Sequence, residues 1–424
     1  MIGKLNNKIK ENGLLLVLSF SFFTSILLAY IIVVYPVFQE GNVEMPFYFT
    51  YNTTKIVVVI LSLMLSFLGI YIRNEFVKTV WFILLMYLYY SSLIYYLFND
   101  AVYGIVLQNI ILLFFVFLAD FVNVRIPTVN LDIQKYSKHL LIISLLLLIP
   151  FLYYIPYIDI SNLWLKNIYE TRLKFREIDL PITGYLVSPL SRVMLPVLFL
   201  YFLHKKNYKS LILPIIGIVF IFLCGATKSI FFGLFAAVLF YFGKNYIDKM
   251  KIFAMSFIFL SIMGIATFLI FDDAEIVDVL IRRLFFIPPY LDNIYYQYFT
   301  DNYTYWTHSH LSFGYYHSFF DYGNSLSMFV GEQVIGKEGL NANTGIITEG
   351  YVSMSYVGIT IHAIFYAFII AFIKNLKVSH IYFGVVFVYI YVLNTSVVST
   401  LILTHGLFFM LLVFAFSLRN TQKK

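Results

Sequence analysis

Long apolar stretches, separated by short polar segments, run along the whole chain. A helix that crosses a membrane needs about 20 mostly apolar residues, and twelve runs approach this length. The pattern therefore predicts an all-α polytopic integral membrane protein with about twelve transmembrane helices. The runs begin near Leu14, Ile56, Thr79, Val102, His139, Gly184, Leu211, Ser229, Ile252, Tyr351, Ile381 and Leu401.

The composition strengthens this interpretation. Apolar residues make up 61% of the 424 residues and charged residues only 12%, whereas soluble domains have about 45–50% and about 25%. A soluble globule with these proportions would lack the polar groups to cover its surface. The composition therefore excludes a cytosolic enzyme, a secreted disulfide scaffold and a disordered chain. With Cys224 as the single cysteine, no intrachain disulfide and no cysteine-based metal site can form.

Lysine and arginine in the short connections indicate the orientation, because cytoplasmic loops of membrane proteins are enriched in these residues. If the N-terminus is cytoplasmic, every short loop on that side is basic. We therefore expect both termini in the cytoplasm and two long loops outside, at 159–183 and 271–350. These loops separate helices 1–5 (1–158), helices 6–9 (184–270), and helices 10–12 with a cytoplasmic tail (351–424).

Both long loops contain amphipathic helical patterns. In the first, SNLWLKNIYETRLKFR places Arg172 and Arg176 one turn apart, on a face suited to the headgroup plane. The second opens with DDAEIVDVLIRRLFF, a helix that we expect to stop at Pro288 and Pro289.

Arginine is concentrated on the predicted outer side, which holds five of the eight arginines but only five of the 21 lysines. Arginine binds phosphate through a planar fork that lysine lacks, and Arg192 lies within the sixth run, where a cation is costly and by default functional. We expect a pyrophosphate-binding set of Arg172, Arg176, Arg192, Lys228, Arg282 and Arg283. The alternatives are local ion pairs for Arg176 and Arg282, and extension of Arg192 to the interface.

Aromatic residues crowd the segment 290–322, as an interfacial belt or as stacking platforms for sugar rings. His308, His310 and His317 lie in the same segment, but no carboxylate pattern accompanies them, so we expect no metal and no other cofactor. Nucleotide-binding loops and the HExxH motif are absent from the sequence.

Several stretches resemble the central region of bacterial oligosaccharide repeat-unit polymerases, the Wzy-type O-antigen and capsule polymerases. They are YETRLKFRE…GYL at 169–186, CGATKS, RRLFFIPPYLDNIYYQYF and GEQVIGKEGLNANTGIITEGYVSMSYVGI. The resemblance covers 165–375, and the family usually shows glycine where this chain has Ser355.

The resemblance implies a glycosyltransferase on the outer face of the bacterial cytoplasmic membrane. It would move a glycan from undecaprenyl pyrophosphate to a new lipid-linked repeat unit. The implied partners are undecaprenyl-pyrophosphate-linked oligosaccharides, membrane lipids and a chain-length regulator protein, and no nucleic acid. An O-antigen ligase, for which we expect a histidine where this chain has Asn343, is an alternative. A polysaccharide flippase or other transporter is disfavoured by the long second loop and the lack of internal repeats.

Transfer requires a base that accepts the proton of the acceptor hydroxyl. Glu349, where the tenth run enters the membrane, is the first candidate, with His317 and His310 in reserve. Alternatively, Glu349 only stabilises a helix N-terminus. The expected sugar-binding residues are Tyr295, Tyr296, Asn341, Asn343, Thr344 and Tyr351.

Overall fold

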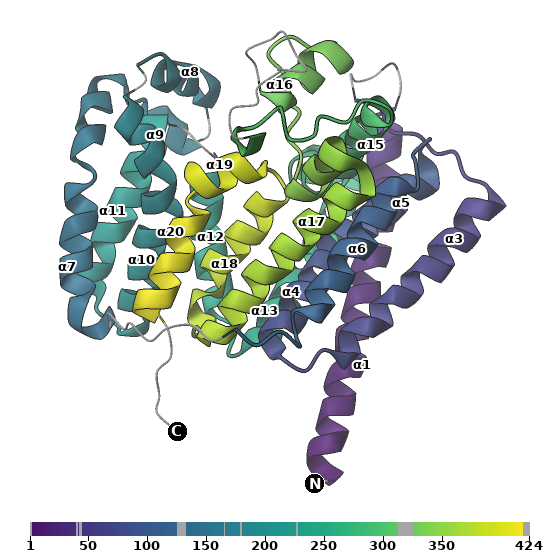
Figure 1. The fold of residues 1–424 in the computed structure, drawn as a ribbon, viewed down its shortest axis with the longest axis horizontal. Coiled ribbons are helices and arrows are strands. Elements are labelled where there is room, and N and C mark those ends of the chain that lie inside the picture. Colours follow the sequence, from purple (N-terminus) through teal and green to yellow (C-terminus); the bar gives the residue numbers. More distant parts are fainter. Residues whose placement is uncertain are drawn as a thin grey trace. The chain divides into compact units, whose positions relative to one another are not determined.

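The computed structural model describes residues 2–39, 41, 45–124, 133–164, 166–178, 180–225, 228–312 and 325–418. Within these ranges the chain forms helices and no strands, so the predicted all-α class is confirmed (Figure 1). The chain divides into two compact units. Unit 1 is Met1–Asn123 with Tyr246–Ala371, and unit 2 is Val124–Asn245 with Phe372–Lys424.

The helices of unit 1 come from both of its sequence segments. They are α1 (Ile2–Ala29), η1 (Tyr30–Val34), α2 (Tyr35–Val37), α3 (Thr53–Leu63), η2 (Met64–Tyr71), α4 (Glu75–Leu84), η3 (Leu85–Tyr89), α5 (Tyr90–Phe98), α6 (Gly104–Leu118), α13 (Tyr246–Phe271), α14 (Glu275–Val277), η7 (Asp278–Phe286), α15 (Ile287–Phe299), η8 (His310–Ser312), α16 (Leu326–Phe329), η9 (Val330–Val334) and α17 (Ile346–Leu376), which ends beyond the unit.

Unit 2 is likewise helical in its described parts. Its helices are α7 (Ile133–Leu146), η4 (Ile149–Tyr157), η5 (Ile160–Trp164), α8 (Ile168–Ile178), α9 (Pro181–Ser188), η6 (Pro189–Met194), α10 (Leu195–His204), α11 (Tyr208–Gly225), α12 (Lys228–Tyr241), η10 (His380–Tyr382), α18 (Phe383–Leu393), α19 (Val398–Leu403), α20 (Leu407–Val413) and η11 (Phe414–Leu418). The amphipathic helix expected in the first long loop is α8, which begins at Ile168.

Among the described residues, eight helical segments are long and apolar enough to cross a membrane, so the chain is a multi-pass membrane protein. They are Lys10–Val37, Thr53–Tyr71, Glu75–Phe98, Ile182–His204, Tyr208–Gly225, Tyr246–Phe271, Ile346–Leu376 and Val398–Leu418. A ninth would join Ile133–Leu146 to Ile149–Tyr157 through a 44° bend. Shorter apolar helices at Gly104–Leu118, Ile230–Tyr241 and His380–Leu393 match the remaining runs, and the count of twelve crossings stays a prediction.

The expected end of the second-loop helix at Pro288 and Pro289 is wrong. The π-helical segment η7 continues directly into α15, and the two prolines occupy the first turn of α15. Proline is tolerated in a first turn because the N–H group that it lacks would have no partner within that helix. The helical path therefore extends to Phe299 and carries Asp292 with it.

The first turns of α17 are separated from the rest of the helix. Met354 and Ser355 leave the helical conformation, with φ 52° and ψ −142° at Ser355. The backbones of Gly350 and Gly358 lie against each other, which shows that the chain folds back at this point. In an unbroken helix, residues eight positions apart would be about 12 Å apart along the axis. The break thus creates a short helix over 346–353.

The segment that follows α15 holds this short helix. The N–H groups of Thr304 and Tyr305 donate to the carbonyl oxygens of Val352 and Ser353, both over 2.9 Å. Because of the break, these two carbonyl groups accept no hydrogen bond from a later N–H group within α17. The contact brings residues 304–309 next to Glu349.

Candidate functional site

A cluster of hydrogen bonds in unit 1 centres on Asp292 of α15. Its Oδ1 atom accepts from the hydroxyls of Thr348 (2.7 Å) and Thr344 (3.0 Å), and its Oδ2 atom accepts from the amide of Gln108 (2.9 Å). Helix α6, helix α15 and the start of α17 therefore meet at one carboxyl group. Asp292 itself stays partly exposed.

The amide of Gln108 is fixed by its other contacts. Its Oε1 atom accepts from the hydroxyl of Tyr296 (3.3 Å) and lies 3.2 Å from the hydroxyl of Thr348, whose single proton is shared with the closer Asp292. This arrangement points the Nε2 donor at Asp292, and networks in which every member has a partner hold their geometry rigidly. The side chain of Asp292 is consequently positioned by residues from three parts of the chain.

Burial raises the pKa of Asp292 to about 6, against the opposing effect of the hydrogen bonds from Thr348, Thr344 and Gln108. A carboxyl group with a pKa near the working pH can accept a proton in a reaction and release it again. Such a shift at a site built from distant segments is typical of functional groups.

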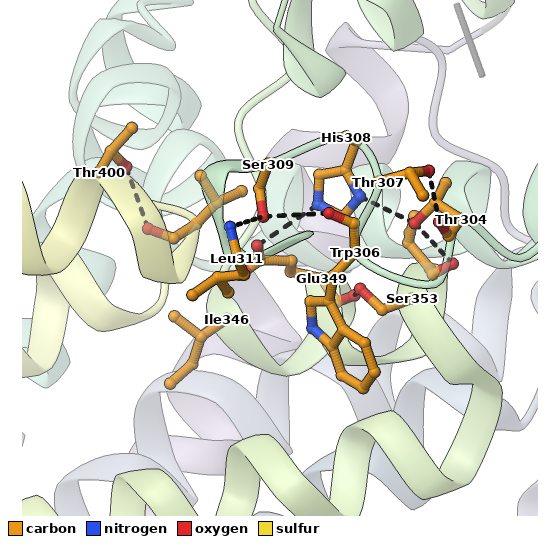
Figure 2. Close-up of polar contacts among 12 residues, drawn as sticks. Thr304, Trp306, Thr307, His308, Ser309, Leu311, Ile346, Glu349, Ser353 and Thr400 are labelled. Carbon is orange, nitrogen blue, oxygen red and sulfur yellow. Dashed lines mark hydrogen bonds and ion pairs between the residues drawn. The ribbon is translucent and has the colours of Figure 1, made fainter. Parts of the chain in front are cut away.

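Glu349 lies in a second cluster, formed by the short first helix of α17 and the segment 304–309. Its side chain is fully buried. The Oε1 atom lies 3.4 Å from Nε2 of His308, and the other ring nitrogen of His308 lies 2.8 Å from the hydroxyl of Thr304. Figure 2 shows Glu349, His308 and Thr304 in this arrangement.

A second imidazole, that of His362, lies near the other carboxylate oxygen of Glu349, with Nδ1 4.0 Å from Oε2. The indole N–H of Trp306 donates to Nε2 of His362 over 3.1 Å, so Nε2 is the unprotonated nitrogen. Nδ1 then carries the proton and donates to the carbonyl oxygen of Ile346. His362 thereby fastens the start of α17 to the main part of that helix.

The burial of Glu349 bears on its predicted role as the base. With no exposed surface, its carboxylate is out of reach of a substrate hydroxyl in this structure. Its contacts with His308 and His362 instead support a role in positioning the short helix that carries Thr348. His317, the reserve base, lies outside the described residues, as does the side chain of His310.

The two adjacent arginines of η7 differ in availability. Arg282 donates to Asp278 over 2.6 Å and stacks on the ring of Phe38 at 4.2 Å, so the local ion pair considered as an alternative is present. The side chain of Arg283 is 52% exposed and lies 3.5 Å from Asp278. Of the two, Arg283 is the one able to reach an anionic ligand.

The other predicted pyrophosphate-binding residues belong to unit 2. Arg192 in η6 is buried, and it interacts electrostatically with Tyr389 and Tyr391 of α18. Arg172 on α8 is partly buried. The side chains of Arg176 and Lys228 lie outside the described residues. A pocket shared by cations of both units stays a prediction.

The predicted sugar-binding residues fall into two groups. Tyr295, Tyr296 and Tyr351 are buried, with the rings of Tyr296 and Tyr351 stacked at 3.7 Å. These contacts give the three rings a packing role here. Thr344 is buried and donates a hydrogen bond to Asp292, whereas Asn341 and Asn343 are exposed on the turn before α17.

Gln108, His362 and Asp292 were not singled out from the sequence, although a signal was available for each. Gln108 and His362 are polar residues inside apolar runs, the same signal that singled out Arg192. Asp292 is an acidic residue within a stretch of apolar and aromatic residues. Among the described residues, no group of His, Cys, Asp and Glu is arranged to hold a metal ion.

The architecture defines the class of protein, an all-α multi-pass membrane protein. No family model, curated protein or solved structure matches this chain.

Proposed function

We propose that this protein is a membrane glycosyltransferase that joins undecaprenyl-pyrophosphate-linked oligosaccharide repeat units into O-antigen or capsular polysaccharide. In this proposal it acts at the outer face of the bacterial cytoplasmic membrane, and both of its termini are cytoplasmic. The basic residues of the short loops support this orientation.

The contact between Asp292 and Thr348 is the observation that carries the proposal. Asp292 lies in RRLFFIPPYLDNIYYQYF, and Thr344 and Thr348 lie in GEQVIGKEGLNANTGIITEGYVSMSYVGI. These are the two stretches of the second loop that resemble the repeat-unit polymerases. The two stretches are joined by the carboxyl group of Asp292, a partly exposed residue whose pKa, about 6, suits proton transfer.

In the proposed reaction, the acceptor hydroxyl oxygen attacks the anomeric carbon of the donor glycan. A glycosidic C–O bond forms, the C–O bond to the pyrophosphate breaks, and undecaprenyl pyrophosphate leaves with the bonding electrons. Ionised Asp292 accepts the hydroxyl proton, because it is both charged above pH 6 and partly exposed. Gln108 and the two threonines hold the carboxylate in place.

Two further features suit a lipid-pyrophosphate donor. The exposed guanidinium of Arg283 can bind a pyrophosphate oxygen through charge-assisted hydrogen bonds. An apolar groove of about 740 Å³ in unit 1 suits an isoprenoid tail, since it is lined by residues of three candidate spans. Its lining includes Leu16, Phe20 and Leu28 of α1, with Ile258, Ile262 and Ile265 of α13.

The test is reconstitution of the purified protein in vesicles with the lipid-linked repeat unit extracted from the source strain. Gel electrophoresis of the released glycan should show a ladder of repeats with the wild-type protein and single repeats without it. Deletion of the gene should likewise leave single repeats in cells. Ladders of wild-type length in the deletion strain would disprove the proposal.

A further inference from the structure

A cavity of about 440 Å³ opens beside α15 in unit 1. Its volume lies within the range of about 300–1,000 Å³ that is usual for small-molecule sites. The lining residues are Tyr290, Ile294, Gln297, Tyr298, Val334 and Ile335. The first four lie on one face of α15, at the spacing of four, seven and eight residues that brings helix positions together.

The chemistry of the lining selects the kind of ligand. All six side chains are uncharged, so the cavity offers no charge partner to a phosphate or a carboxylate. Two tyrosine rings and three aliphatic side chains suit the C–H face of a sugar ring, while the amide of Gln297 can bond its hydroxyls. A neutral carbohydrate matches this combination of apolar faces and hydrogen-bonding groups.

The aromatic walls are held in place before any ligand binds. The ring of Tyr298 packs edge-on against Phe299 at 4.9 Å and against Phe329 at 5.7 Å. The ring of Tyr290 contacts Phe47 at 6.0 Å and Tyr95 at 6.3 Å. Rings that are already fixed lose little conformational entropy on binding, which favours affinity.

The cavity is separate from the carboxyl group of Asp292. Successive residues of a helix point about 100° apart, so Asp292 lies about 200° around α15 from Tyr290 and from Ile294. The two sites therefore use opposite faces of one helix. A sugar in the cavity is thus some distance along the glycan from the residue that reacts beside Asp292.

We propose that this cavity is a subsite for neutral sugar residues of the lipid-linked glycan, away from the reacting bond. The proposal rests on the proposed glycosyltransferase function. By holding the glycan at a second point, the subsite increases the time that a chain spends bound and hence the number of additions before release. Loss of the subsite shortens the polymer without removing the chemical step.

The test compares Gln297→Ala and Tyr298→Ala with Gln333→Ala, which removes another exposed glutamine outside the cavity lining. Calorimetry measures binding of the oligosaccharide released from the lipid-linked repeat unit by mild acid. Both cavity variants should bind it about tenfold more weakly than wild type and give shorter ladders on reconstitution. Gln333→Ala should match wild type.

Thermal unfolding of each variant identifies any loss of binding that comes from misfolding. If Tyr298→Ala unfolds, Gln297→Ala, at an exposed position, decides the result.

The possible results distinguish a failure of the subsite from a failure of the proposed glycosyltransferase function. Wild-type protein that polymerises but fails to bind the free oligosaccharide overturns the subsite alone. The same holds if both cavity variants bind and polymerise as wild type does. Wild-type protein that forms no polymer overturns the proposed function. Asp292→Asn, which lies outside the cavity, should bind the oligosaccharide normally while forming no ladder.

Discussion

Gly350 and Gly358 lie backbone to backbone across the break in α17. A Cβ atom on Gly358 would lie 2.0 Å from the carbonyl oxygen of Gly350, and one on Gly350 would lie 2.6 Å from that of Gly358. Real Cβ atoms do not approach a carbonyl oxygen so closely, and the obstacle at both positions is backbone. The fold-back that places Glu349 and Thr348 therefore requires glycine at both positions.

Gly358→Ala should accordingly destabilise the protein by about 1–3 kcal/mol, the usual range for overpacking that moves backbone. Thermal unfolding in detergent measures the loss. Gly13→Ala on α1 is the matched control, because no atom lies within 4 Å of the added methyl group. It should be neutral or stabilising by up to about 1 kcal/mol, since alanine favours a helix. An equal melting temperature for Gly358→Ala and wild type would exclude the close approach.

Ser355→Gly should stabilise the protein. Ser355 has φ 52° and ψ −142°, a conformation that glycine adopts freely but that costs other residues about 1–3 kcal/mol. We expect a rise in stability of about 1 kcal/mol, reduced by the greater freedom of glycine in the unfolded chain. Ser256→Gly, in the middle of α13, should instead lower stability by about 0.5 kcal/mol. A loss of stability in Ser355→Gly similar to that in Ser256→Gly would contradict the left-handed conformation of Ser355.

The break at Ser355 shows which structural features can be predicted from the sequence and which cannot. Glycine usually stands at this position in the polymerases that the sequence resembles, so Ser355 could be singled out from the sequence alone. Hydrophobic periodicity predicted a helix through the same residues, because the apolar pattern continues on both sides of the break. Each of the eight candidate spans among the described residues coincides with an apolar run of the sequence. Such runs carry no information on where a contact between distant glycines interrupts a helix.

The rate of polymerisation should depend on the ionisation of Asp292. Its pKa is about 6, so the fraction of ionised base, and with it kcat/KM, should rise tenfold per pH unit below pH 6 and level off above it. Asp292→Asn should lower the rate by a factor of about 10²–10⁴ and remove this dependence. Reconstituted polymerisation between pH 5 and 8 measures both effects.

Asp301→Asn provides the control for the loss of a negative charge, because Asp301 is exposed just after α15. Its pH profile should match that of wild type. A stability measurement gives an independent check on Asp292. Its folded-state pKa exceeds the usual 3.8, so the folded protein binds the proton more tightly and stability should fall as pH rises from about 4 to 6. Unchanged pH dependence of both rate and stability in Asp292→Asn would exclude the shift.

Glu349 should matter for stability more than for proton transfer. Glu349→Ala leaves His308 and His362 facing a cavity, and loss of a buried charged partner costs about 2–4 kcal/mol. Glu349→Gln keeps the shape and should cost less, while retaining polymerisation and its acidic limb near pH 6. Unfolding and rate measurements on the two variants test this. If Glu349→Gln were stable and inactive, the base would be Glu349, as the sequence analysis proposed.

Glu349 and Asp292 also show which features of the site cannot be predicted from the sequence. Glu349 was identifiable because it lies beside the asparagine-rich turn at the start of an apolar run. Its burial comes from residues 304–309 and from His362, which no local pattern connects to it. Asp292 contacts Gln108, which lies 184 positions away in sequence. Contacts over such separations depend on how α6, α15 and α17 pack, and helical periodicity does not specify that packing.

The proposed orientation predicts opposite labelling of two exposed positions. Asn207, in the turn between α10 and α11, is flanked by Lys206 and Lys209 and should be cytoplasmic. Tyr305, 62% exposed after α15, should lie outside. In a Cys224→Ala background, an impermeant thiol reagent added to whole spheroplasts should label Tyr305→Cys and leave Asn207→Cys unreacted until the membrane is opened. Because both side chains are exposed, the difference in labelling reports the side of the membrane. Labelling of position 207 but not 305 in intact cells would reverse the orientation and place Asp292 on the cytoplasmic side.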